Sequence, residues 1–126
     1  IGSPSMNIIE GAVEERVFKT RGLELSKQGY EFIDGCVNNH ARATIGVRPE
    51  DILTGENVYR APFQSEVLID LVEPMGSDTL VYSELAGHPL RIRTDGKTKM
   101  NAGERLRVGI EPSQASLFNA DTEDRL

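Results

Sequence analysis

The 126-residue sequence contains no tryptophan, a single cysteine, Cys36, and only two histidines. One cysteine excludes an internal disulfide and is typical of a reducing compartment. The histidines, His40 and His88, are 48 residues apart, a separation that matches no familiar zinc spacing. Four phenylalanines and three tyrosines are the only aromatic residues, so the core must consist mainly of valine, isoleucine and leucine.

Long hydrophobic runs and an excess of positive charge are also lacking. No run approaches the roughly 20 apolar residues that a membrane-spanning helix needs, and no signal-peptide pattern opens the chain. The formal net charge of −6 argues against general nucleic-acid binding, which requires a cationic surface. The length suits one domain with its own core. The first residue, Ile1, is not Met, which indicates a piece of a longer intracellular protein.

Two common enzyme signatures are missing as well. The sequence has no G-x-x-x-x-G-K-[ST] loop to hold phosphates and no G-x-S-x-G around a nucleophilic serine. Cys36 lies between Gly35 and Val37, a setting more typical of a small buried residue than of a nucleophile. We therefore expect no catalytic residue, no metal site and no cofactor site within this chain.

Short apolar segments separated by turns run through the chain. The segments expected to be strands are LELS (23–26), QGYEFIDG (28–35), TIGV (44–47), EVLIDLVE (66–73), TLVYSEL (79–85), LRIRT (90–94) and RLRVGI (105–110). Several alternate apolar and polar residues, as a half-buried strand does. In LRIRT we expect Leu90 and Ile92 to be buried and Arg91 and Arg93 to be exposed. No stretch sustains a helical period, so the sequence predicts an all-β barrel or sandwich.

One small phrase occurs twice. GVRPEDIL (46–53) and the looser GIEPSQASLF (109–118) begin 63 positions apart. In each copy a strand runs into Gly, a branched apolar residue, a charged residue and then Pro, which suits the first position of a helical turn. Arg48 and Glu111 are poor N-caps, so we expect only a turn or two. The repeat predicts either a packing device used at two places in a barrel or a duplicated binding edge.

One stretch, RIRTDGKTKMNAGERLR (91–107), is strongly basic. Its cations are Arg91, Arg93, Lys97, Lys99, Arg105 and Arg107. Only Asp95 and Glu104 oppose them. We expect this stretch to form a hairpin whose cations share one face, suited to an oxyanion or an acidic partner. A solvated outer face without a partner is the alternative.

Four phrases in order resemble a known family. They are IGSPSMN (1–7), GVRPEDI (46–52), VEPMGSDT (72–79) and GERLRVGIEPSQASLF (103–118). Together they closely resemble the C-terminal portion of the ATP-binding subunits of sugar ABC importers, of the maltose and glycerol-3-phosphate types. The usual phrases of that family are IGSPxMN, GIRPE, VExLGx(E/D)T and PxxxHLF. In this chain Met75 replaces the usual leucine, and Ser116 stands where histidine is common.

The resemblance implies a fold and a place in a larger protein. The fold would be an OB-like β-barrel of the transport-associated, MOP-like type with short helical turns. Residues 1–10 would be the linker from a nucleotide-binding domain, and residues 11–126 a regulatory β domain with halves of about 11–56 and 63–120. The parent would be a peripheral ATPase on the cytoplasmic side of the inner membrane, where a homodimer works beneath two membrane subunits. ATP and Mg²⁺ would bind only in the nucleotide-binding domain, outside this chain.

The resemblance also implies a function without catalysis by this chain, namely regulation and dimerisation, with a cytosolic regulator as a further partner. The alternative is a small-ligand barrel that binds an oxyanion or a sugar. A nucleic-acid-binding barrel is the weakest hypothesis, because Tyr82 is the only aromatic residue near the basic stretch. The interface and regulatory candidates are Ser3, Pro4, Met6, Asn7, Arg48, Pro49, Glu50, Gly76, Arg91 and Arg93.

Overall fold

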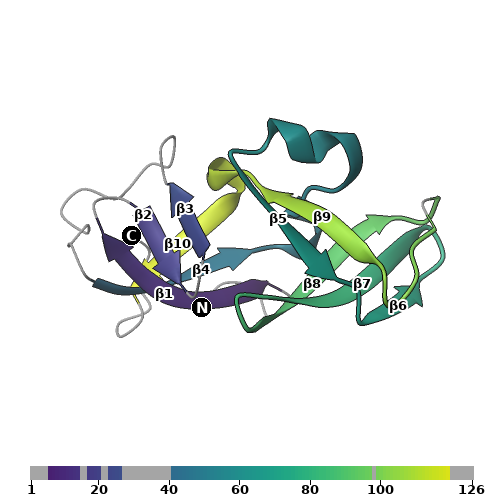
Figure 1. The fold of residues 1–126 in the computed structure, drawn as a ribbon, viewed down its shortest axis with the longest axis horizontal. Coiled ribbons are helices and arrows are strands. Elements are labelled where there is room, and N and C mark those ends of the chain that lie inside the picture. The colour runs from purple at the N-terminus through teal and green to yellow at the C-terminus, as the bar shows by residue number, and fades with distance from the viewer. Residues whose placement is uncertain (1–5, 15–16, 21–22, 27–40, 98, 120–126) are drawn as a thin grey trace.

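The computed structural model describes residues 6–14, 17–20, 23–26, 41–97 and 99–119, and these form strands, turns and short 3-10 helices (Figure 1). The strands are β1 (Asn7–Glu14), β2 (Val17–Thr20), β3 (Leu23–Ser26), β4 (Ala41–Val47), β5 (Phe63–Leu68), β6 (Leu71–Pro74), β7 (Asp78–Leu85), β8 (His88–Asp95), β9 (Arg105–Ile110) and β10 (Ala115–Asn119). The 3-10 helices are η1 (Pro49–Asp51), η2 (Gly55–Arg60) and η3 (Pro112–Gln114). The predicted all-β class with short helical turns is confirmed.

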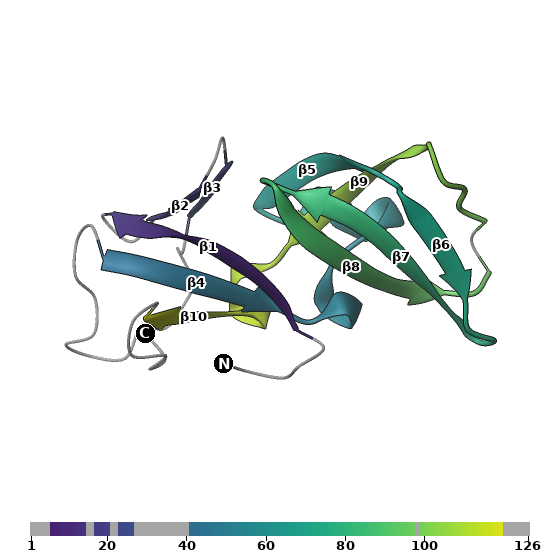
Figure 2. The same ribbon diagram turned by 90° about the horizontal axis from the view of Figure 1, so that it is seen from below.

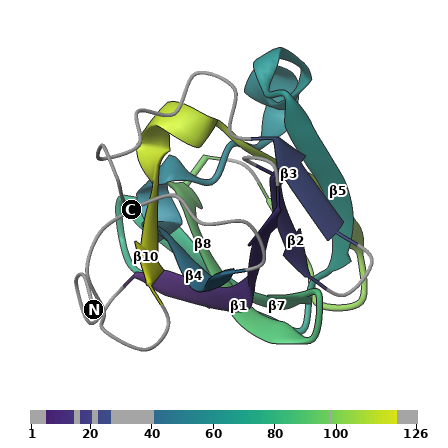
Figure 3. The ribbon, with the colours of Figure 1, turned by 90° about the vertical axis from the view of Figure 1, so that its left-hand side faces the viewer.

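The strands are arranged in three antiparallel sheets. A five-stranded sheet has the order β10-β4-β1-β2-β3, a three-stranded sheet has the order β6-β7-β8, and β5 pairs with β9. The five-stranded sheet forms one end of the molecule and the other two sheets form the opposite end (Figures 1 and 2). Seen along the long axis, the strands curve around a common interior (Figure 3).

The segment that follows each copy of the repeated phrase pairs with the other copy. After η1, Leu53 pairs with Gly109 of the second copy, and each backbone N–H donates to the other's carbonyl at 2.9 Å. After η3, β10 pairs with β4, and Ser116 lies opposite Gly46 of the first copy. The two pairings join equivalent positions of the copies, because Gly109 lies 63 residues after Gly46 and Ser116 lies 63 residues after Leu53. Each copy therefore sends the chain into a strand pairing of the other half.

A single helical turn lies where the chain leaves each copy to pair with the other. Arg48, the N-cap of η1, is extended at φ −70° and ψ 146° and has no side-chain cap, and Pro49 follows it. The Asp51 N–H donates to the Arg48 carbonyl at 2.9 Å, and the Gln114 N–H donates to the Glu111 carbonyl at the same distance. The short turns expected from the sequence are confirmed for both copies, and the first has no side-chain cap.

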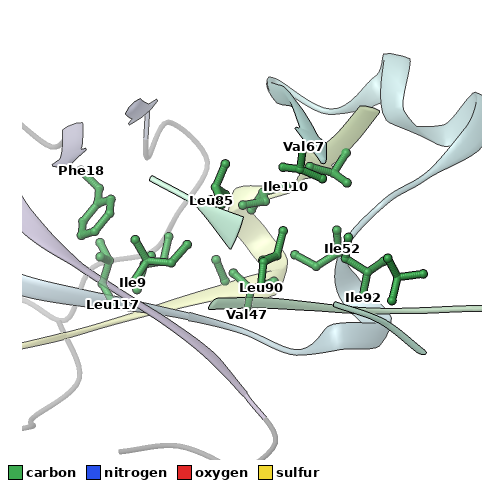
Figure 4. Packing of buried hydrophobic residues seen from close by; sticks show 14 of the residues in the cluster. Ile9, Phe18, Val47, Ile52, Val67, Leu85, Leu90, Ile92, Ile110 and Leu117 are labelled. Atoms are coloured by element: carbon green, nitrogen blue, oxygen red, sulfur yellow. The ribbon is translucent and has the colours of Figure 1, made fainter. Parts of the chain in front are cut away.

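One aliphatic core continues through both ends of the molecule (Figure 4). Phe18, Ile9 and Leu117 pack against one another beside the five-stranded sheet. Val47, Leu85, Leu90, Ile110, Ile52, Val67 and Ile92 continue the same cluster towards the other sheets. As expected from the alternation in LRIRT, Leu90 and Ile92 are buried while Arg91 and Arg93 are exposed. A single core means that the two halves stabilise each other.

A pair of side chains joins β1 to the edge of β8. Asn7 is only 5% exposed. Its Nδ2 donates to the Arg91 carbonyl and its Oδ1 accepts from the Arg91 N–H, both at 2.8 Å. Nearby, Nε2 of His88 accepts from the Glu10 N–H at 3.3 Å, while Nδ1 lies 3.0 Å from the Ala86 carbonyl. We call this pair of contacts the β1–β8 clasp.

The structure bears on two element boundaries expected from the sequence. EVLIDLVE (66–73) is not one strand, because the Ile69 N–H donates to the Glu104 carbonyl while the Asp70 N–H donates to the Tyr82 carbonyl. The chain thus changes sheets between β5 and β6. Strand β1 starts at Asn7, inside the range 1–10 that was expected to be linker, and the domain boundary stays a prediction. QGYEFIDG, Cys36 and His40 lie outside the described residues.

We predict that Asn7→Ala lowers the free energy of unfolding by about 1–3 kcal/mol, because it leaves two backbone groups of Arg91 without partners. Urea denaturation followed by circular dichroism measures the change. Asn101→Ala is the control, since Asn101 donates to Glu104 from an exposed position, and it should change stability by no more than about 0.5 kcal/mol. Equal effects of the two substitutions would contradict the role of the clasp.

The repeated glycines should differ in their tolerance of alanine. A Cβ at Gly109 would lie 2.8 Å from the Ala61 Cβ, which packing holds in place, whereas at Gly46 it would meet the flexible end of the Met6 side chain. We expect Gly109→Ala to lower the free energy of unfolding by about 1–3 kcal/mol through overpacking. Gly46→Ala should have a smaller effect in the same urea titration, and the reverse order would contradict this packing.

Candidate functional site

The predicted interface and regulatory residues lie in different parts of the molecule. Met6, Arg48 and Glu50 line one pocket, whereas Arg91 and Arg93 are exposed on β8. The remaining candidates belong to neither group. Pro49 is buried in η1, and Asn7 belongs to the β1–β8 clasp. Gly76 is exposed between β6 and β7 with φ +87°, and Ser3 and Pro4 lie outside the described residues.

The first group surrounds a pocket where the two repeated phrases meet, which we call the seam pocket. Its volume is about 430 Å³. It is lined by Met6, by Arg48, Glu50 and Asp51 of the first copy, and by Ser113, Gln114, Ala115 and Ser116 of the second copy. The sequence predicted a role for the repeat but not a shared pocket, because the strand exchange that unites the copies leaves no mark in either phrase alone.

The seam pocket combines both signs of charge. Arg48 and Glu50 are exposed and Asp51 is half-buried, so one guanidinium faces the same space as two carboxylates. An oxyanion site needs donors that converge without competing negative charge. This lining therefore favours a mixed polar surface over an oxyanion.

The second group lies on the outer surface of β6, β7 and β8. On β7, Val81, Ser83 and Leu85 are buried, so Leu80 and Tyr82 point outwards. The strand register places side chains in two rows across the sheet: Glu73, Leu80 and Arg93 form one row, and Leu71, Tyr82 and Arg91 form the next. We call these six residues the sheet face.

Contacts within the sheet face connect its three strands. The Arg91 guanidinium carbon lies 5.9 Å from the centroid of the Tyr82 ring, a cation–π distance. The Tyr82 hydroxyl donates to Oε1 of Glu73 at 3.5 Å, a long hydrogen bond. Sequence reasoning named Arg91 and missed Glu73 and Tyr82. The alternation in TLVYSEL could have placed Tyr82 on an outer surface, but the order of the strands was needed to place it between Glu73 and Arg91.

The predicted basic hairpin is wrong. β8 pairs with β7, and β9 pairs with β5, so the arginines of the two strands belong to different sheets. On β9, Arg105 lies 3.5 Å from Glu66, and Nε of Arg107 donates to Gln64 at 3.0 Å. The turn at Asp95 and Gly96 does form, but the loop that follows carries the chain to β5 rather than back along β8.

The described part of the chain contains no group of three or more His, Cys, Asp or Glu side chains that could hold a metal ion. Both ring nitrogens of His88 have protein partners: Nε2 accepts from the Glu10 N–H of β1, and Nδ1 lies 3.0 Å from the Ala86 carbonyl. Among the same residues, no helix has the length and apolarity needed to cross a bilayer.

Comparison with protein families gives two adjoining matches. The family model of the MalK OB fold domain matches residues 2–52, and that of the TOBE domain matches residues 45–118. The second match covers more than half of the chain. The two matches overlap across the first copy of the repeated phrase, where η1 carries the chain from one sheet towards another.

Two curated relatives match nearly the whole chain. The xylose/arabinose import ATP-binding protein XacK of Haloferax volcanii is 30% identical over 133 residues, which cover 100% of this chain and 33% of the relative. The sn-glycerol-3-phosphate import ATP-binding protein UgpC of Brucella abortus biovar 1 is 33% identical over 124 residues, which cover 96% of this chain and 32% of the relative. The chain thus spans about a third of the length of these relatives.

A solved structure has the same fold. ModG, described as a cytoplasmic molybdate-binding protein, matches with a TM-score of 0.69 over 93% of this chain and 98% of its own, at 14% sequence identity. This identity supports a statement about the fold alone. Because the TOBE match covers most of the second half and the MalK OB fold match most of the first, the chain belongs to the TOBE-domain family and corresponds to the C-terminal region of the ATP-binding proteins of sugar and glycerol-3-phosphate importers.

Proposed function

We propose that this chain is the regulatory and dimerisation module of the ATP-binding subunit of a carbohydrate importer. The observation that carries the proposal is the succession of a MalK OB fold match and a TOBE match along one chain. Relatives named for the import of xylose or arabinose and of sn-glycerol-3-phosphate share this region. ATP and Mg²⁺ would bind to a nucleotide-binding domain in another part of the same protein, so this region itself would not catalyse hydrolysis.

The fold supports a mechanical role. The strand exchange and the shared core tie the two halves together, so a force applied to one half is transmitted to the other. A dimer of such modules would hold two ATPase subunits together while their nucleotide-binding domains open and close. The module would work with membrane subunits on the cytoplasmic side of the inner membrane, as a peripheral component.

The seam pocket is the proposed place for a cytosolic regulator. Met6, which lines it, lies one residue before β1, while Arg48 and Gln114 belong to the two repeated phrases. A partner bound there would contact both halves and the chain segment that leads into the domain. The mixed charges of the seam pocket suit a protein surface with charged groups of both signs.

A small-ligand module is the second candidate, because ModG, which has the same fold, is described as binding molybdate. The two carboxylates in the seam pocket argue against an oxyanion there. Isothermal calorimetry with molybdate, sulfate and phosphate should therefore show no binding heat. Saturable heat with any of the three, lost in an Arg48→Ala variant, would favour the ligand module instead. Xylose and maltose titrated in the same way test the sugar form of this candidate, and glycerol-3-phosphate tests a phosphorylated polyol.

The leading proposal predicts association without nucleotide binding. Sedimentation equilibrium should show a dimer, and the melting temperature should not change with Mg-ATP, because a ligand stabilises only a protein that binds it. Longer chains that include the nucleotide-binding domain provide the positive control for the nucleotide. A monomer at the highest accessible concentration would contradict dimerisation, and a higher melting temperature with Mg-ATP would contradict the absence of a nucleotide site.

A further inference from the structure

We propose that a second pocket, beside η2, binds a monosaccharide. This pocket, which we call the η2 pocket, has a volume of about 340 Å³ and a mainly apolar lining. It shares no lining residue with the seam pocket. The binding is inferred from the geometry of the pocket. Its meaning, a sugar that acts on the regulatory module of an importer from the cytoplasm, rests on the proposed function.

The η2 pocket lies where η2 packs against β9. In Figure 1, η2 is the teal coil at the top, beside β5 and β9. The two elements can approach closely because β9 has a glycine here: a Cβ at Gly109 would lie 2.8 Å from the Ala61 Cβ and 3.4 Å from the Val58 carbonyl oxygen. Val58 is buried, which fixes η2 on the strand. The lining consists of Gly55, Glu56, Val58 and Tyr59 of η2 and of Leu106 and Arg107 of β9.

An exposed aromatic ring lines this pocket. Tyr59 is 74% exposed, and no other large apolar side chain among the described residues is exposed as much. In a 3-10 helix, side chains three positions apart lie one above the other, so Glu56 and Tyr59 share one side of η2. The C–H groups on one face of a sugar ring are apolar and pack on an aromatic face, whose π electrons attract them. Tyr59 therefore offers a stacking surface beside a carboxylate.

Arg107 brings hydrogen-bond donors to the same pocket. Its Nε donates to Oε1 of Gln64 at 3.0 Å, and Nε2 of Gln64 donates to the carbonyl of Ala61, directly after η2, at 3.2 Å. These bonds link Arg107 to the end of η2 and use only its Nε, so both terminal NH₂ groups can donate to a ligand. Glu66, which lies opposite Arg107 in the strand register, is 3.5 Å from Arg105. The nearest carboxylate along the ladder thus has another cationic partner.

The charges of the η2 pocket favour an uncharged ligand. Its lining contains one carboxylate, Glu56, and one guanidinium, Arg107. An anion would lie near the carboxylate and a cation near the guanidinium, so neither is favoured. A sugar hydroxyl both donates and accepts, and it can form a charge-assisted hydrogen bond with either group. A zwitterion gains less, because ion pairs at exposed groups contribute little.

The size of the pocket limits the ligand further. Small-molecule sites have volumes of about 300–1,000 Å³, and the η2 pocket lies near the lower end of this range. One sugar ring, stacked on Tyr59 with its hydroxyls towards Glu56 and Arg107, suits this space better than an oligosaccharide does.

Titration of the isotope-labelled chain with D-xylose, D-glucose and D-galactose, followed by nuclear magnetic resonance, tests the site. At least one of these sugars should shift the backbone amide resonances of η2 and β9 saturably, with a dissociation constant on the order of millimolar, as suits a shallow pocket. The amides of Arg48 and Gln114, beside the seam pocket, should not shift. No saturable shift with any of these sugars at up to about 100 mM would overturn the inference. L-Leucine, an apolar zwitterion, should shift none of these amides, and equal shifts with leucine would contradict the preference for an uncharged ligand.

Substitutions separate stacking from other contacts. Tyr59→Ala should raise the dissociation constant for the sugar at least roughly tenfold, whereas Tyr59→Phe keeps the ring and should change it by no more than about twofold. Arg107→Ala should raise it at least roughly threefold through lost hydrogen bonds. Tyr82→Ala removes a ring from the sheet face instead and is the matched control, with no expected change. Unchanged binding in Tyr59→Ala, or an equal loss in Tyr59→Phe, would overturn stacking on Tyr59. The amide spectrum of each variant shows whether it is folded.

The outcomes separate this inference from the proposed function. A dimer that no sugar shifts overturns the η2 pocket and leaves dimerisation standing. A monomer whose η2 and β9 amides shift with sugar contradicts dimerisation and leaves the η2 pocket standing. Sugar binding that is lost in Arg48→Ala and kept in Tyr59→Ala assigns the sugar to the seam pocket and overturns the site proposed here.

Discussion

The reciprocal pairing of Leu53 with Gly109 and of Ser116 with Gly46 is the constraint on which the rest of the fold depends. In each repeated phrase, proline contributes no N–H, ends the strand and starts a single turn. The chain then crosses to the other half and completes a pairing there. Neither half possesses all of its own strand partners, and the continuous core follows from this exchange because residues of both halves must be buried together.

This exchange also determines where functional groups can lie. The two turns are brought side by side, so their polar residues line the seam pocket, which neither phrase could form alone. The β1–β8 clasp holds the three-stranded sheet against the rest of the domain through Asn7 and His88. Because the backbone groups of Arg91 on β8 are bonded to Asn7 and the inner side of the sheet is buried, that sheet presents mainly its outer side chains. The pocket and the sheet face are thus fixed to one stiff body, which suits a module that passes forces between larger subunits.

Much of the local structure could be predicted from the sequence. Alternation in LRIRT and RLRVGI identified strands, and in LRIRT it also identified the buried residues Leu90 and Ile92. Periodicity fails where the chain changes its surroundings within one apolar run, as at Ile69, which ends one pairing before Asp70 enters another. Periodicity also does not specify partners. Arg91 and Arg105 were expected on one hairpin, yet their strands pair with β7 and β5, because pairing is decided by contacts between distant segments. For the same reason Arg48 was recognised as a candidate while Ser113 and Gln114, its neighbours across the pocket, were not.

Native-state hydrogen exchange is the most direct test of the central claim that the two halves form one cooperative unit. The amides of Leu53 and Gly109, which bond to each other's carbonyls, can be followed beside those of β4 and β10. If the reciprocal exchange holds the domain together, these amides exchange only through global unfolding, with the same free energy and the same dependence on denaturant. Exchange of one half through a partial opening of clearly lower free energy, while the other half stays protected, would contradict the account.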